Sequence, residues 1–98
     1  MKNSFVARIK WITFENGGRS TVIPQGVRYC PIIKISDDKV AGDWSIDFIS
    51  PDFNETDIIE FRFLSNYAPE ELLKCGKIYG LFEGSKKVAV IKILSKKK

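Results

Sequence analysis

KIYGLFEGSKKVAVIKIL, residues 77–94, consists of two apolar runs separated by a short polar segment. The segment Glu83-Gly84-Ser85-Lys86 is typical of a tight turn, because glycine tolerates a positive φ angle. The runs on either side, 77–82 and 87–94, are rich in the residues that strands prefer. This stretch therefore predicts an antiparallel β-hairpin.

The same preference for strands extends through most of the chain. Apolar and polar residues alternate in SFVARIKWITF (4–14), in WSIDFI (44–49) and in DIIEFRFL (57–64). Alternation with a period of two predicts half-buried strands, each with one face toward a core. The apolar faces so defined are Phe5, Ala7, Ile9 and Trp11; Trp44, Ile46 and Phe48; and Ile59, Phe61 and Phe63.

A further strand is predicted in YCPIIKI (29–35), where Pro31 indicates that the strand begins after it or lies at a sheet edge. One segment, APEELLKCG (68–76), predicts a helix of no more than two turns. Pro69 suits its first position, acidic residues follow in the first turn, and Gly76 suits its end.

Six or seven strands at intervals of about ten residues indicate a closed β-barrel or a β-sandwich. A barrel leaves no exposed strand edge, which matters for strands this rich in Ile and Val. We therefore expect an all-β fold, a six-stranded antiparallel closed β-barrel with one short helical turn near 69–75. The 98 residues suit one domain, which we place at 1–95, followed by a basic tail at 96–98.

The net charge of +4 comes from 16 basic and 12 acidic residues. Removing the three final lysines leaves 13 against 12, a nearly neutral body. A basic tail binds phosphates through counterion release, but a solvated chain end is the interpretation we favour. With no signal-like N-terminus and no long apolar run, we expect a cytoplasmic protein that does not enter membranes, with Cys30 and Cys75 reduced.

The sequence argues against catalysis. It contains no histidine, which removes the commonest general base and metal ligand. It also lacks the glycine-rich phosphate-binding and dinucleotide-binding motifs. The acidic stretch SPDFNETD (50–57) offers oxygen ligands for a cation, but a surface loop explains it better. We expect no enzyme activity, no cofactor, no metal and no small-molecule substrate.

Basic and aromatic residues are interleaved in the first third of the chain, as in surfaces that bind nucleic acids. The alternative is that the aromatic rings lie in the core and the cations on the solvated faces of strands, and composition favours this alternative. The residues concerned are Arg8, Lys10, Arg28, Tyr29 and Lys34.

Two blocks of the sequence resemble the C-terminal β-barrel domain of elongation factor Tu. In the first, 12–35, Gly17-Gly18-Arg19, Thr21, Gly26 and Arg28 stand where that family has its Gly-Gly-Arg, Thr and Gly-Tyr-Arg residues. In the second, 57–94, Glu83-Gly84, Lys86 and Val88 follow the family's last turn and strand. Departures occur at Val27, at Tyr29-Cys30, at Ser85-Lys86 and at Ala89, and the segment 36–52 is not similar.

The resemblance implies a barrel of about six strands that touches the backbone of the tRNA T-stem. It implies that Arg19, Cys30 and Glu83 face RNA on one rim, with Arg19 meeting a phosphate and Glu83 a ribose hydroxyl. A structural alternative pairs Arg19 with a nearby carboxylate, and Asn16-Gly17-Gly18 is first of all a turn. The full set of candidate binding residues is Gly18, Arg19, Arg28, Tyr29, Cys30, Glu83 and Lys86.

Two functions remain open. The first is a stand-alone module that binds tRNA-like RNA or docks on a protein of the translation machinery. The second is a protein-interaction module, such as an inhibitor, a regulator or an immunity-type protein, that has kept the fold and lost the RNA surface. The nearly neutral body and the substituted motif positions motivate the second.

Overall fold

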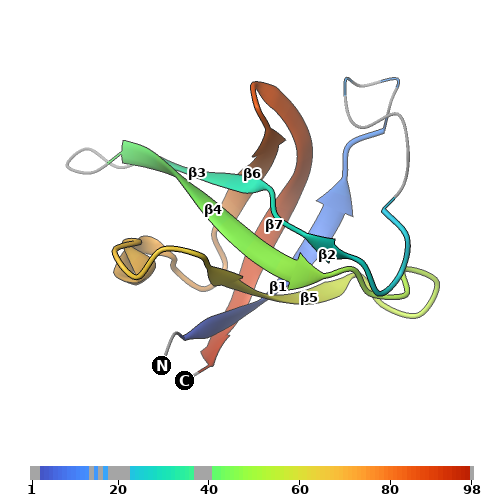
Figure 1. Ribbon diagram of the computed structural model, residues 1–98. Helices are drawn as coiled ribbons and strands as arrows, with labels where there is room; N and C mark the ends of the chain where they lie inside the picture. Colours follow the sequence, from blue (N-terminus) through green and yellow to red (C-terminus); the bar gives the residue numbers. More distant parts are fainter. Residues whose placement is uncertain (1–2, 14, 16, 18–22, 37–40, 98) are drawn as a thin grey trace.

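The computed structural model describes residues 3–13, 15, 17, 23–36 and 41–97. Its strands form one antiparallel sheet that closes on itself in the order β4-β3-β6-β7-β1-β5, with β5 pairing back to β4 (Figure 1). The predicted six-stranded closed barrel is therefore confirmed. The elements are β1 (Ser4–Trp11), β2 (Arg28–Tyr29), β3 (Ile32–Ser36), β4 (Ala41–Ile49), β5 (Ile58–Phe63), the 3-10 turn η2 (Glu70–Leu72), β6 (Ile78–Glu83) and β7 (Lys86–Lys97).

β2 and β3 act as one strand that is interrupted at its proline. Both pair with β4 in a single register, since Tyr29 lies opposite Phe48 and Ile32 opposite Ser45. Across the interruption, the amide of Ile46 donates to the carbonyl of Pro31 at 3.1 Å. Proline has no N–H to donate to a ladder, which explains the break. β3 begins after Pro31 as predicted, and the short pairing before it was not foreseen.

The predicted hairpin is confirmed. β6 and β7 pair from Ile78 opposite Lys92 to Glu83 opposite Lys86, around a two-residue turn. Gly84 has a φ of +61° and no non-glycine residue described has a positive φ, which is the pattern of a type II′ turn.

β7 is the longest strand and carries both β-bulges of the sheet. The register shifts between Leu81 and Phe82 on β6, and between Val6 and Ala7 on β1, so β7 has one extra residue at each point. A bulge bends a strand and increases its twist. This bending lets a twelve-residue strand follow the curved wall past both of its neighbours.

The core consists of the inward side chains of the barrel strands. Phe5 stacks on Phe61 with ring centroids 5.4 Å apart, and Phe63 meets both rings edge to face. Burial of each such ring contributes roughly 1.5–3 kcal/mol. The apolar faces predicted for the strands are buried, except that Trp11 and Trp44 are half-buried at the barrel ends.

The chain enters and leaves the barrel at the same end (Figure 1), where Ser4 pairs with Lys97. Lys96 and Lys97 belong to β7, so the segment expected as a basic tail is paired strand as far as Lys97. η2 covers this end as a single 3-10 turn, shorter than the two turns allowed, and Glu70 accepts a hydrogen bond from Asn3. Among the described residues, no helix is long and apolar enough to cross a membrane.

Candidate functional site

Three surfaces of the barrel gather the residues that bear on function. We call them the rim cluster, the paired face and the lysine face. The rim cluster comprises Trp11, Tyr29, Phe53 and Glu83, at the end of the barrel opposite the chain termini. The paired face comprises Arg28, Asp47, Glu60, Arg62 and Lys97, and the lysine face comprises Lys10, Lys34, Lys87 and Lys92.

The rim cluster brings together Tyr29 and Glu83, two of the candidate binding residues. The Tyr29 hydroxyl donates a hydrogen bond to the Glu83 carboxylate. The ring of Tyr29 lies 5.7 Å from that of Trp11, which in turn meets Phe53 edge to face at 5.9 Å. Tyr29 is half-buried, so its side chain packs into the mouth of the barrel rather than standing out as a platform for a base.

The other described candidate residues lie nearby, Lys86 on the same face as Glu83 and the others on the opposite face. Lys86 is exposed and pairs with Glu83 across the turn. Arg28 and Cys30 flank Tyr29 in sequence, so their side chains point outward on the opposite side of the strand, and the Cys30 thiol is free and exposed. Gly18 and Arg19 lie outside the described residues, and the proposed rim shared by Arg19 and Glu83 stays a prediction.

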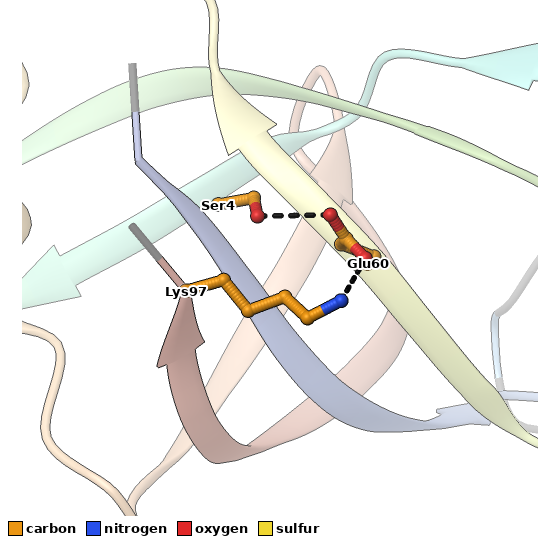
Figure 2. A network of polar contacts seen from close by, with 3 residues as sticks. All are labelled: Ser4, Glu60 and Lys97. Atoms are coloured by element: carbon orange, nitrogen blue, oxygen red, sulfur yellow. Dashed lines mark hydrogen bonds and ion pairs between the residues drawn. The ribbon is translucent and has the colours of Figure 1, made fainter. Parts of the chain in front are cut away.

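On the paired face, opposite charges from different strands meet, between the neighbours β2 and β4 and, across β1, between β7 and β5. Arg28 contacts Asp47 at 2.9 Å, and Asp47 lies directly opposite Arg62 on β5. Glu60 accepts hydrogen bonds from Lys97 at 3.1 Å and from Ser4 at 2.9 Å (Figure 2). These two bonds, with Lys97 contributing the larger part, hold the pKa of Glu60 below its ordinary value. The cations of this face are therefore largely neutralised by their neighbours.

The lysine face lies on the outer side of β1, β7, β6 and β3. Lys10 lies opposite Val90, Val90 opposite Gly80, and Gly80 opposite Lys34, which places these four residues in one row across four strands. With strands about 4.8 Å apart, the row spans roughly 14 Å. Because side chains alternate along a strand, Lys92 shares this outward face with Val90.

The bulge in β7 adds a further lysine to this face. After the shift in register Lys87 lies opposite Phe82, the outward residue of β6 next to Gly80. A Cβ atom on Gly80 would come within 2.9 Å of both Lys87 Cε and the Phe82 ring. These side chains therefore lie over the bare backbone of Gly80, and the Lys34 ammonium sits 4.3 Å from the centre of the same ring.

The lysine face differs from the paired face in its electrostatics. All four of its lysines are exposed, and among the described residues none has a carboxylate within 4.0 Å. Asp43 lies opposite Lys34 in register, and it is the one acidic side chain that adjoins the row among the described pairings. Several like charges on one wall create a positive potential that attracts anions.

Sequence reasoning found part of this face. Lys10 and Lys34 were among the cations interleaved with aromatic residues, and the structure brings them into one row. Lys87, Lys92 and Gly80 were missed. A period of two applied to 87–94 would have placed Val90 and Lys92 on one side of the strand, but the bulge that turns Lys87 to the same side leaves no local signal.

An open pocket of about 430 Å³ adjoins the row at its β1 end. Its lining consists of Lys10, Trp11, Ile12, Thr13 and Val90. Lys10 and Val90 thus belong both to the row and to the pocket. A second pocket, of about 220 Å³, lies on the paired face beside Arg28 and Asp47. In the part of the chain that the structure describes, no cluster of acidic or thiol groups fits a metal ion.

Comparisons of this chain with protein-family models, with curated protein sequences and with solved structures found no match.

Proposed function

We propose that this barrel is a non-enzymatic module that binds RNA through phosphate contacts on the lysine face. The observation that carries the proposal is the row from Lys10 to Lys34 with Lys87 and Lys92 beside it, four exposed lysines without ion pairs among the described residues. Keeping like charges on one wall is unfavourable, and the phosphates of a nucleic acid relieve that repulsion.

The relationship to the C-terminal barrel of elongation factor Tu is part of the proposal. Its support is the pair of sequence blocks, together with a closed six-stranded antiparallel barrel of the kind that the resemblance implies. In this proposal tRNA-like RNA is the partner, and Glu83 and Lys86 supply rim contacts beside the main surface. The two free, exposed thiols favour a reducing compartment, so we propose that the module acts in the cytoplasm.

Binding of a tRNA transcript measured across a salt series tests this function. Four lysine–phosphate contacts predict a slope of about −2.8 in the logarithm of affinity against the logarithm of salt concentration, at ~0.7 per contact. Lys34→Gln combined with Lys92→Gln should halve that slope to about −1.4.

The matched control is Arg62→Gln combined with Lys97→Gln, which removes the same charge from the paired face. We expect this control to bind like the unmodified protein, because those cations already face carboxylates. Absence of any salt-dependent affinity for RNA in the unmodified protein would overturn the proposed function.

A protein-interaction module is the second candidate, because two apolar side chains stand exposed beside Lys92. Ile78 lies opposite Lys92 and is 66% exposed, and Leu94, the second residue after Lys92, is 39% exposed. A protein partner that binds here should be lost on Ile78→Ser and retained after nuclease treatment. Binding that responds to the lysine variants and not to Ile78→Ser favours RNA instead.

A further inference from the structure

We propose that the pocket beside the lysine row takes an unstacked nucleobase, so that the module prefers single-stranded RNA to duplex RNA. This inference rests on the proposed function and adds which part of a tRNA-like RNA is recognised, namely its unpaired nucleotides and not the T-stem duplex that the resemblance implies. It begins from the position of Lys10, which lies at one end of the row and also lines the pocket of about 430 Å³. If an RNA strand binds Lys10 through a phosphate, the base of that nucleotide is within reach of the pocket.

The chemistry of the pocket suits a base better than it suits a phosphate. Val90, Ile12 and the half-buried Trp11 are the apolar residues of its lining, and exposed Lys10 also lines it. A lysine in such a position can cover apolar surface with its alkyl stem while its ammonium stays in water. A volume of this size lies in the range of pockets that hold small organic ligands. A phosphate loses hydration on apolar walls, whereas a planar base gains contact with them.

A base pocket at this position predicts different affinities for duplex and single-stranded RNA. The bases of a duplex are stacked and paired inside the helix, and only its phosphates and sugars reach a convex protein wall. A single strand can turn one base out while its backbone continues along the lysines. Stacking of one base on a protein surface typically improves affinity by roughly 5- to 100-fold, and we expect a preference of that size.

The experiment compares a single-stranded RNA oligonucleotide with the duplex formed from it and its complement. Both are titrated into the Trp44→Phe protein, in which Trp11 is the remaining tryptophan and reports on the pocket. We expect the single strand to bind roughly 5- to 100-fold more tightly and to quench the Trp11 emission, whereas the duplex leaves that emission unchanged.

Val90→Phe fills the pocket without changing charge. We expect it to lower the affinity for the single strand to that for the duplex while the salt slope stays the same. Val6→Phe is the matched control, since Val6 is half-buried on β1 away from the pocket, and we expect it to bind normally. If Val90→Phe does not fold, Ile12→Ser makes the same test by adding a polar group to the pocket wall.

Three outcomes are distinguishable. Equal affinities for single strand and duplex, or normal single-strand binding by folded Val90→Phe and Ile12→Ser proteins, overturn the base pocket and leave the proposed function standing. The absence of salt-dependent binding to either RNA overturns the proposed function itself. Loss of single-strand preference with an unchanged salt slope supports both.

Discussion

Tyr29 shows how the sequence leaves two roles open for one aromatic side chain. Beside Arg28 it is a candidate binding residue, whereas composition favours a ring that packs into the core. In the structure its ring packs on Trp11 and its hydroxyl donates to Glu83. A tyrosine with an apolar ring and one polar atom fits the boundary between core and solvent, so here its contribution is to the closure of the barrel mouth.

Tyr29→Phe should therefore destabilise the protein by about 0.5–3 kcal/mol, because it removes a hydrogen bond to a charged acceptor and keeps the ring contacts. Urea unfolding followed by circular dichroism measures the change. Tyr67→Phe is the control, since Tyr67 is 89% exposed, and it should have no effect. An unchanged midpoint for Tyr29→Phe would show that its hydroxyl contributes nothing to stability.

The contacts of Glu60 predict how the stability of the fold depends on pH. Its bonds to Lys97 and Ser4 lower its pKa in the folded protein below the ordinary value of 4.5 (Figure 2). A carboxyl with a lowered pKa stabilises the fold fully above the unfolded pKa, and that contribution is lost as pH falls through the folded pKa. The effect is small and weakens with salt, because these side chains are exposed.

Glu60→Gln should therefore lower stability at neutral pH and not below the folded pKa of Glu60. The loss of stability between pH ~4.5 and lower values should be shallower for this variant than for the unmodified protein. Thermal unfolding across a pH series at low salt measures both. Parallel pH profiles for the two proteins would contradict this account of Glu60.

The end of β7 is a charged segment that is paired as a strand and is not a solvated tail as far as Lys97. Three consecutive lysines indicated a solvated tail, but Lys97 pairs with Ser4 and Lys96 with Phe5. The Lys96 ammonium also lies 3.9 Å from Glu70 and 5.9 Å from the centre of the Phe5 ring. Strand pairing with β1 is a backbone property, so it places Lys96 and Lys97 in the barrel wall despite their charged side chains.

Ending the chain at Leu94 should consequently lower the free energy of unfolding by about 1–3 kcal/mol. The truncation removes ladder bonds to β1 and uncovers part of the Phe5 ring. The control replaces Lys96 and Lys97 with glutamine, which keeps the backbone and should cost less than the truncation. Chemical denaturation compares the three proteins, and equal stability of the truncated and unmodified chains would mean that this pairing is not stabilising.

At the level of the whole barrel, closure brings the two ends of the chain together. Because Ser4 and Lys97 pair, a short linker can join them without disturbing the ladder (Figure 1). The loop before β5 is exposed at Asn54 and Glu55, so new ends can be made there.

A circular permutant opened between Asn54 and Glu55 should fold with the same circular dichroism spectrum and melt within about 10 °C of the parent. A permutant opened between Ile91 and Lys92 is the contrasting case. It cuts the strand that pairs with both β1 and β6, and it should not fold. If both permutants fold equally well, the continuity of β7 is not essential to the barrel.

The positions of the strands and their buried faces were predictable, because they depend on information within a few residues. Alternation identified Phe5, Ile59 and Phe61 as core, and Gly84 marked the hairpin turn through its positive φ. Of the candidate site, the sequence placed Lys10 and Lys34 correctly on strands and grouped them only as cations interleaved with aromatic residues. It assigned Glu83 to the hairpin turn, whereas Glu83 is the last residue of β6.

The amino-acid pattern determined where the chain forms strands and which side of each strand is apolar, since a period of two is a local property. The tertiary structure decided which strands became neighbours, where β7 gained its two bulges, and that lysines from β1, β3 and β7 share one wall. Which strands pair depends on the free energy of the whole set of pairings, because together they must close the barrel and bury one core. The lysine row and its adjoining pocket are products of that closure.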